Sequence, residues 1–537
     1  MKLPAAAARG SVTPAFRESC GCHGHRKGHV LSKMSKLITD QRSSLKFEGP
    51  CLFLNLQRES GGSGYEPREK CGIFGIFGHR GAVEKTFFGL HALQHRGQES
   101  AGIAVSDGEL LHCHTGMGLV GEVFHKAVLR RLSALGQSAI GHVRYSTSGS
   151  SRLENAQPIL AEYSQGQIAV AHNGNLINAM LLRDEYEGHG HIFKGTCDSE
   201  IIIHLLAKPT HVSKPDPMAH VLNHLQGAFC LLFLFRDRII AARDSYGVRP
   251  LCIGQLAEGT YVVASETCAL DIVEAEFIRE VEPGEIVTID KHGLHSRFFD
   301  GPGAVRPAYC IFEQIYFADP SSMIFGENVH MVRHAMGRQL AREAPVDADL
   351  VIPVPNCARC AAGGYSEESG IPYGRGFTVS HYAGRSFIEP EQPTRDLAVK
   401  MKLNVIKEVV AGKRLVVIED SIVRGTTTRG KMGALRRAGA KEIHLRVSSP
   451  PIRHPCFYGI DFPSREELIA NHRTVEEIRD YLEIDSLQYL SREGMLTSVT
   501  FPDDHYCTAC FTSDYPIPVG EAVSKYTFER YQQRLFK

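Results

Sequence analysis

The sequence has neither a net charge nor a hydrophobic run long enough to cross a membrane. Lysine plus arginine and aspartate plus glutamate each number 60, so the overall charge does not attract the protein to nucleic acid or to a membrane surface. The longest apolar run, residues 228–235, is far shorter than the roughly 20 residues of a membrane helix. The first residues also lack the continuous apolar region of a secretory signal. These absences predict a cytoplasmic protein with neither membrane nor nucleic acid as a partner.

The chain has 15 cysteines but no secretory signal, so we expect reduced thiols, metal ligands or catalysis rather than disulfides. Its 537 residues are too many for one core, and two or three domains are expected. Residues 1–70 show no sustained periodicity and end near a flexible Gly61–Gly64 hinge, so we interpret them as a leader. The leader contains four possible metal ligands, which are Cys20, Cys22, His23 and His25. Because no second ligand pair lies nearby, an irregular leader is the preferred interpretation.

Regular structure is expected to begin at residues 71–78, where the alternation suits a strand with one packed face. Helical patterns cover residues 86–94 and 196–207, and the second has Asp198 and Glu200 in its expected first turn. This mixture predicts a layered α+β domain over residues 71–300. Its further expected strands are residues 102–106, 138–143, 167–172, 229–235, 238–243, 261–265 and 285–289.

Beyond the turn-forming Gly301–Gly303 the pattern changes. A long helical pattern covers residues 329–343, and short apolar runs separated by helical stretches follow at 350–354, 414–418 and 444–448. Strands that alternate with helices predict a parallel, doubly wound α/β sheet in residues 301–537. Ligands of such sheets gather at the carboxyl ends of the strands.

One of these strands leads into an acidic loop. Glu419 and Asp420 follow the strand, and small hydroxyl residues then open a helix. Backbone N–H groups and the helix dipole at such a loop attract a phosphate, and the acids can accept hydrogen bonds from ribose hydroxyls. The Walker pattern is absent, and from spacing alone an ordinary strand–helix turn is about as good an interpretation as a sugar-phosphate site. The candidate phosphate-binding residues are Ser421, Arg424, Gly425, Thr426, Thr427 and Thr428.

Several residues of the amino half have ordinary interpretations when each is taken alone. Cys71 could be a small buried hydrophobic residue, Asn173-Gly174 a hairpin turn and Asp198 a helix cap. Taken together with four segments they resemble the class II glutamine amidotransferases, whose nucleophile is an N-terminal cysteine. The resemblance implies a four-layer αββα fold of the N-terminal-nucleophile type. The four segments are residues 93–102, 141–147, 172–176 and 197–200.

The resemblance also implies how the nucleophile is made. The thiol of Cys71 would attack the glutamine amide, and its own α-amino group, with a pKa of about 7.7–8.0, would take the thiol proton. That amine is free only after cleavage between Lys70 and Cys71. Residues 1–70 are therefore expected to be a propeptide that is removed.

Four further residues receive roles from the same resemblance. The side chain of Asn173 and the backbone N–H of Gly174 would hold the developing oxyanion, the largest single term in acyl transfer. Arg144 would pair with the α-carboxylate of glutamine, and Asp198 would receive its α-ammonium group.

Residues 416–428 resemble the phosphoribosyl diphosphate (PRPP) signature of type I phosphoribosyltransferases, which implies ribose and Mg²⁺ contacts for Glu419 and Asp420. The 5-phosphate would bind to residues 421–428. Further segments extend the resemblance to the amidophosphoribosyltransferase family over nearly all of residues 71–515. These segments are residues 329–343, 348–355, 382–388 and 449–452.

This family resemblance implies a reaction. Glutamine would aminate PRPP to 5-phosphoribosylamine, with glutamate and diphosphate as the other products, in the first committed step of purine synthesis. The ammonia would pass internally from the first site to the second. The resemblance further implies a homotetramer and feedback by purine nucleotides.

The chain departs from the family pattern in its second half. Glu419–Asp420 replaces paired aspartates, and Asn356–Ala358 replaces Asp-Ser-Gly in the diphosphate loop. One Mg²⁺ contact would therefore fall on Cys357, although a thiol is a poor ligand for this hard cation. Val379–His381 replaces Lys-Asn-Arg, and Asp319 replaces an arginine. Because the phosphate loop is intact, we expect PRPP to bind.

Four more cysteines are candidate metal ligands, and thiolates from such distant places suit an iron–sulfur cluster. Their positions match the ligands of the 4Fe-4S cluster that many members of the family carry. Alternatively, the pair Cys357/Cys360 could form a zinc site together with the pair Cys507/Cys510. We favour the cluster over zinc, and over purely structural thiols, because Cys357 falls in the diphosphate loop. The four candidates are Cys310, Cys456, Cys507 and Cys510.

Two other functions stay open at this point. A class II glutaminase could serve another acceptor, as in glucosamine-6-phosphate or asparagine synthesis, but the loop at residues 419–428 argues against both. A non-enzymatic protein, or one with weakened transferase activity, could keep the fold as a sensor of PRPP or nucleotides. The altered diphosphate loop favours that alternative, but the complete set of amidotransferase motifs would be idle there.

Overall fold

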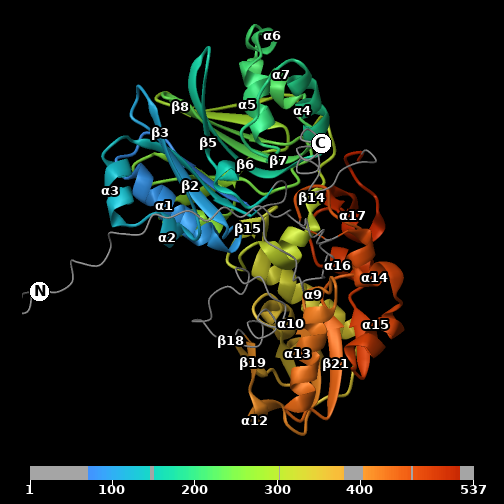
Figure 1. Ribbon diagram of the computed structural model, residues 1–537. Coiled ribbons are helices and arrows are strands. Elements are labelled where there is room, and N and C mark those ends of the chain that lie inside the picture. Colours follow the sequence, from blue (N-terminus) through green and yellow to red (C-terminus); the bar gives the residue numbers. More distant parts are fainter. Residues whose placement is uncertain are drawn as a thin grey trace, which may run out of the picture. The chain divides into compact units, whose positions relative to one another are not determined.

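The computed structural model describes residues 71–145, 150–301, 303–379, 403–460, 462 and 464–519 (Figure 1). The predicted propeptide, the matched segment 382–388 and the substituted positions Ser380 and His381 lie outside these ranges. All described residues belong to one compact unit. Among them, no helix has both the length and the apolar character that a membrane crossing requires.

The amino half contains two antiparallel sheets. The first has the strand order β11-β9-β10-β1-β4-β2-β3, and the second has the order β13-β12-β8-β7-β6-β5. The first sheet consists of β1 (Gly72–Ile76), β2 (Ser100–Ser106), β3 (Leu111–Met117), β4 (Ser138–Arg144), β9 (Cys252–Gln255), β10 (Tyr261–Ala264) and β11 (Glu276–Glu280). The second consists of β5 (Ile159–Tyr163), β6 (Gly166–Leu176), β7 (Gly227–Leu234), β8 (Arg238–Arg243), β12 (Glu285–Asp290) and β13 (Gly293–Phe298).

Alternating side chains of the two sheets meet in a buried core between them, which includes Ile73 of β1 and Ala171 of β6. Helices cover the outer faces and bury a second set of side chains. The four layers confirm the predicted αββα fold. The helices on the first sheet are α1 (Ala82–Ala92), α2 (Val120–Val123), α3 (Lys126–Ser133) and α8 (Thr267–Ile272), and those beside the second are α4 (Ala179–Gly188), α5 (Glu200–Ala207), α6 (Pro209–Val212) and α7 (Pro217–Leu222).

Two local expectations for this half are wrong. The helix predicted over residues 196–207 begins only at Glu200, so Asp198 precedes it instead of lying in its first turn. The Asp198 carboxylate accepts a hydrogen bond from the backbone N–H of Leu176 at 2.9 Å, which ties the loop to the end of β6. The hairpin alternative for Asn173-Gly174 is also wrong, because both residues lie within the long strand β6.

The carboxyl half is built on a parallel sheet with the order β17-β20-β21-β22. Val416 and Ile418 pack into a core with α9 and α10, while Leu415 and Val417 pack into another with α13 and α15. Helices on both faces confirm the predicted α/β architecture. The elements are β17 (Leu350–Pro353), β20 (Arg414–Glu419), β21 (Glu442–Val447), β22 (Ser486–Tyr489), α9 (Val329–Glu343), α10 (Arg359–Ser369), α13 (Thr426–Arg437) and α15 (Val475–Leu482).

Shorter elements complete the described part of the chain. The paired short strands are β14 (Tyr309–Cys310) with β23 (Tyr506–Cys507), β15 (Met323–Ile324) with β16 (Glu327–Asn328), and β18 (Phe377–Val379) with β19 (Leu403–Val405). The short helices are α12 (Lys407–Val410), α14 (Ile469–His472), α16 (Arg492–Leu496), α17 (Ala509–Thr512), a π-helix at Glu313–Phe317, and 3₁₀ turns at Leu93–His95, Leu153–Asn155, Arg465–Glu467 and Asp503–His505.

The two halves share buried surface. Ile177 and Val248 of the amino half belong to the same apolar core as Phe312 and Tyr458 of the carboxyl half. The domain boundary at residue 300 thus separates two sheet systems along the chain, and it stays a prediction.

Candidate active sites

Cys71 lies directly before β1 and is buried. Since Ile73, two residues later, points into the core between the sheets, the pleat directs Cys71 toward the same interior. Its Sγ lies 3.4 Å from the carbonyl oxygen of Tyr145. Burial raises the pKa of the Cys71 thiol to about 11, although the charge of Arg144 acts in the opposite direction. At neutral pH the thiol therefore keeps its proton, and a base must remove it before it can attack an amide.

Asn173 and Gly174 approach from the facing sheet at the end of β6. Asn173 lies two residues beyond core residue Ala171, so it faces the same interior as Cys71. Its amide is buried, and neither its nitrogen nor its oxygen has a hydrogen-bond partner within the described ranges. An unpaired buried polar group costs about 1–3 kcal/mol, which a substrate atom could offset. Gly174 has φ +151°, and a Cβ there would lie 2.0 Å from the carbonyl oxygen of Ala228, so glycine is required.

Arg144 and Asp198 place one charge of each sign beside the thiol, since both change the pKa of Cys71. Arg144 ends β4 and is almost fully buried. Its guanidinium lies 3.7 Å from a carboxylate oxygen of Glu99 and donates to the carbonyl oxygen of Ser150 at 3.4 Å. A buried cation and a buried anion beside one thiol suit a free amino acid, whose α-carboxylate and α-ammonium need partners of opposite charge.

A hydrogen-bond network that the motifs did not predict supports Asp198. The hydroxyl of Ser199 lies 3.3 Å from one Asp198 oxygen, 2.9 Å from Nδ1 of His172 and 3.0 Å from the amide nitrogen of Gln157. Gln157 lies 42 residues before Ser199 in the sequence, so the fold, and not a local motif, brings these residues together.

Arg96 lies within the segment 93–102, but the motif did not predict its contacts. Its Nε donates to the carbonyl oxygen of Cys71 at 3.1 Å, and its guanidinium pairs with Glu266 and, at 2.9 Å, with Glu313. These three charged side chains are fully buried. Removing one member of a buried ion pair is strongly destabilising, so this network fixes the backbone of the nucleophile.

The same network continues into the carboxyl half. Glu313 also pairs with the buried Arg249 at 3.2 Å, and Arg249 donates to the carbonyl oxygen of Tyr458. Tyr458 lies two residues after Cys456, so a chain of buried polar contacts joins the nucleophile to the cysteine-rich region.

The second site is a pocket at the carboxyl ends of β17 and β20. It holds about 490 Å³ of empty space, counted out to the solvent at its mouth. Arg424 and Thr426 are not among its lining residues in the described part of the chain, and the guanidinium of Arg424 pairs with Glu467. The lining residues are Tyr316, Pro355, Asn356, Cys357, Glu419, Asp420, Ser421, Val423, Gly425, Thr427, Thr428 and Lys431.

The loop geometry suits a phosphate. Gly425 is the N-cap residue directly before α13 and has φ +78°, and a Cβ there would lie 2.8 Å from Cδ1 of Ile469. The hydroxyl of Ser421 donates to Asp420 at 2.7 Å. The first N–H groups of α13 have no partner within the helix and carry its positive dipole end, which attracts anions.

Lys431 was not predicted as a pocket residue. Its ammonium lies 3.4 Å from a carboxylate oxygen of Glu419, and both side chains are buried. Lys431 follows Thr428 by three positions on α13, so both reach the same helix face. That spacing is the one sequence signal that could have indicated it.

The four candidate cluster cysteines are neighbours. Cys310 and Cys507 are register partners in the β14–β23 pair. Burial raises the pKa of Cys510, and the nearby Cys507, Cys310 and Cys456 raise it further. All four are free thiols. The rival pair lies elsewhere, because Cys357 lines the pocket and Cys360 lies 3.2 Å from Nδ1 of His330.

Known proteins with similar sequences and folds indicate the family of this chain. Residues 142–271 match the family model described as a glutamine amidotransferase domain. The chain is 48% identical over 465 residues to amidophosphoribosyltransferase 1, chloroplastic, of Arabidopsis thaliana, and the match covers 86% of this chain and 81% of that protein. The chain belongs to the amidophosphoribosyltransferase family.

Two solved structures extend this result to the fold of an amidophosphoribosyltransferase. Glutamine PRPP amidotransferase from B. subtilis, complexed with ADP and GMP, is 46% identical with a TM-score of 0.79, over 84% of this chain and 99% of that chain. A structure described as the allosteric regulatory enzyme of purine biosynthesis is 46% identical with a TM-score of 0.80, over 84% of this chain and 98% of that chain.

As an amidophosphoribosyltransferase, the chain is a glutamine-dependent transferase of purine biosynthesis. It forms 5-phosphoribosylamine, glutamate and diphosphate from glutamine and PRPP. The predicted activity and enzyme class are confirmed. The alternatives, a sensor and a glutaminase serving another acceptor, find no support.

Proposed function

We propose that the two sites perform the two steps of this reaction. The first site hydrolyses glutamine at Cys71, and the second uses the ammonia to displace diphosphate from PRPP. The observation that supports the first assignment best is a group of four buried, sequence-distant residues, in which a cation and an anion act on the thiol and an amide on the facing sheet has no partner within the described ranges. These residues are Cys71, Arg144, Asn173 and Asp198.

In the first step the free α-amino group of Cys71 takes the thiol proton, which requires that the bond between Lys70 and Cys71 has been cleaved. The thiolate forms a bond to the amide carbon of glutamine, the protonated α-amino group of Cys71 gives its proton to the amide nitrogen, and the C–N bond breaks so that ammonia leaves. Water then hydrolyses the thioester to glutamate. Asn173 and the N–H of Gly174 stabilise the oxyanion, and removal of one such donor costs about 10²–10³ in kcat in other acyl-transfer enzymes.

In the second step the ammonia nitrogen forms a bond to C1 of the ribose, and the bond to diphosphate breaks with its electron pair on the leaving oxygen. Glu419 and Asp420 hold the ribose hydroxyls, and the loop from Ser421 to Thr428 holds the 5-phosphate. The buried carboxylates fit Mg²⁺ as ligands, whereas the thiol of Cys357 does not. Bound Mg²⁺ would neutralise charge on the diphosphate.

We also propose that the four neighbouring cysteines hold a 4Fe-4S cluster. Four neighbouring free thiols, two of them buried and two partly buried, act on one another's pKa and form a donor set of the right chemistry. Each thiolate would otherwise be costly to bury, so iron would supply the missing positive charge. The cluster would hold together the three segments around residues 310, 456 and 507–510.

Regulation, oligomeric state and location complete the proposal. Purine nucleotides regulate the enzyme, which the ADP and GMP in the B. subtilis structure support for this chain as well. The enzyme is a homotetramer, and mass measurement in solution tests this. It is cytoplasmic, and cell fractionation decides this against a plastid location, since the Arabidopsis relative is named as chloroplastic.

The decisive assay compares glutamine with an ammonium salt as the nitrogen source, using purified protein and Mg-PRPP. The wild-type chain is expected to form phosphoribosylamine from both. Cys71→Ala is expected to lose synthesis from glutamine and keep synthesis from ammonia. Loss of both activities together, in a variant that melts like the wild type, would show that the sites are not separable.

A further inference from the structure

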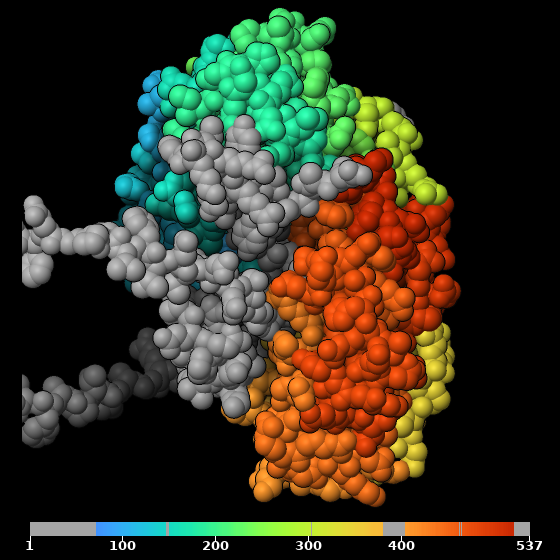
Figure 2. Space-filling view, turned by 45° about the vertical axis from the view of Figure 1, so that its right-hand side comes forward, coloured from blue at the N-terminus to red at the C-terminus, as the bar shows by residue number. Residues whose placement is uncertain are grey.

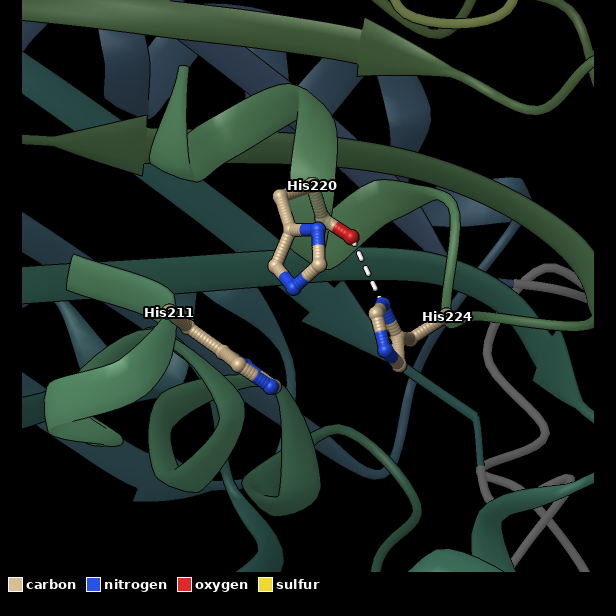
Figure 3. A group of neighbouring side chains, drawn as sticks. All are labelled: His211, His220 and His224. Carbon is tan, nitrogen blue, oxygen red and sulfur yellow. Dashed lines mark hydrogen bonds between the residues drawn. The ribbon is translucent and has the colours of Figure 1, made fainter. Parts of the chain in front are cut away.

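Three histidines that neither step uses lie together beside α6 and α7 (Figure 3). His211 belongs to α6, His220 to α7, and His224 follows α7 in the turn before β7. One ring nitrogen of each lies within 4.8 Å of those of the other two. His211 is buried and His224 is exposed, so the group opens to solvent. The green part of the chain that includes α6 and α7 also forms an outer face in Figure 2.

Hydrogen bonds settle which ring nitrogens are free in two of the three residues. Nδ1 of His211 lies 3.0 Å from the carbonyl oxygen of Leu205, and Nδ1 of His224 lies 2.7 Å from the carbonyl oxygen of His220. A carbonyl can only accept, so both Nδ1 atoms carry the proton. The lone pair of each neutral ring is then on Nε2. Histidines that bind metals have this same arrangement, with the second nitrogen donating to a carbonyl.

Coordination needs the neutral form of the imidazole, and a histidine with the ordinary pKa of about 6.5 is mostly neutral above pH 7. The nearby cation of Lys208 is paired with Glu185 at 3.3 Å.

We propose that His211, His220 and His224 bind a divalent transition-metal ion, with Zn²⁺ as the best fit and water as the fourth ligand. Zinc–nitrogen bonds of about 2.0–2.1 Å place the nitrogens of a tetrahedral site about 3.3 Å apart, so the rings need to close by about 1.5 Å at most. The spacing of four residues between His220 and His224 brings their rings together at the end of the helix, with centroids 4.6 Å apart. Imidazoles without a carboxylate select zinc, copper or nickel over magnesium or calcium.

The ion would join two short helices to the turn that precedes β7. This turn is tied to the end of β6, because Asn178 donates to the carbonyl oxygen of His224 at 2.8 Å and accepts from the N–H of Gln226 at 3.0 Å. Metal binding should therefore stabilise this region without contact with either substrate. The role of the ion is structural, and the inference does not depend on the catalytic assignments.

The test titrates the full-length protein with Zn²⁺ in competition with a coloured chelator. Because thiols also bind zinc, the result is the difference between the wild type and His220→Gln/His224→Gln. The wild type is expected to bind one more Zn²⁺ per chain, and its Co²⁺ form to show the visible band of a four-coordinate site, which the variant lacks. His292→Gln, at an exposed turn, is the matched control and should behave as the wild type.

Glutamine-dependent activity without added zinc, equal in all three proteins, establishes that the variants are folded. If the double variant does not fold, the single His224→Gln at the exposed position is used, with an affinity loss of at least about tenfold expected. Equal zinc stoichiometry and equal affinity in the wild type and the folded histidine variants would overturn the proposal.

Discussion

Cys71 cannot ionise readily where it lies, because burial raises its thiol pKa to about 11. If its α-amino group is the base, that amine must lose its proton before the reaction. The kcat/KM for glutamine should then rise with pH, with a midpoint of about 7–8. The measurement is the initial rate of glutamine hydrolysis between pH 6 and pH 9. A rate that stays constant over this range would exclude the amine as the base.

Lys431 brings a cation into the PRPP pocket beside Glu419. Replacing it with methionine removes a charged partner from the phosphates and leaves Glu419 without this ammonium. Since hydrogen bonds to charged groups contribute about 1.5–3 kcal/mol, we expect Lys431→Met to raise the KM for PRPP by about tenfold or more. Lys431→Arg, which keeps the charge, should raise it less. Steady-state kinetics with ammonia as the nitrogen source measure this, and an unchanged KM would remove Lys431 from the site.

These residues differ in how far the sequence could reveal them. Cys71, Arg144, Asn173 and Asp198 were predicted because motifs carry them, and all four are buried in the structure. Lys431 was missed because a lysine on a helix is ordinarily solvated, and its burial depends on the tertiary fold. The catalytic and binding roles themselves stay predictions until the variants are assayed.

At the scale of single elements, the turn into α13 depends on Gly425. Its φ of +78° lies in the left-handed region, and a Cβ would also crowd Ile469. Gly425→Ala should therefore distort the phosphate loop and raise the KM for PRPP at least about tenfold, while glutamine hydrolysis continues. Gly430→Ala in the same helix is the matched control, because a Cβ there meets nothing within 4 Å. Equal KM values in the two variants would contradict the assignment of this loop.

The predicted strands of the amino half correspond to central strands of the sheets. The strands that were not predicted include all four edge strands, which are β3 and β11 in the first sheet and β5 and β13 in the second. Their side chains are partly exposed, as in the pattern of β11 with three exposed residues in succession. An edge strand buries too little apolar surface to show a clear alternation. Three of the four strands of the parallel sheet were predicted, and the strand that was missed, β22, again lies at an edge and is partly exposed.

Buried ion pairs connect the amino half of the protein to its carboxyl half. Arg249→Met would leave the carbonyl of Tyr458 without its donor and Glu313 with one arginine fewer. Breaking a buried pair in this way costs about 3–5 kcal/mol, so thermal unfolding should occur at a clearly lower temperature. Arg238→Met is the control, because its pair with Asp237 is exposed. Identical melting of the two variants would show that the network does not hold the halves together.

Sequence patterns could not reveal this network. Arg96 lies within a predicted motif, but Glu266 and Glu313 lie 170 and 217 residues further along the chain. Charged residues are ordinarily placed at the surface. Only the packing of the first sheet against the segment around residue 313 brings them together.

Glutamine is expected to be attacked by a thiol whose own main-chain nitrogen has been set free by cleavage. Intact-mass and N-terminal analysis of the catalytically active protein can establish this. We expect the active chain to begin at Cys71 and a fraction that retains residue 70 to hydrolyse no glutamine. Full glutamine turnover by a chain in which Lys70 is still joined to Cys71 would contradict it.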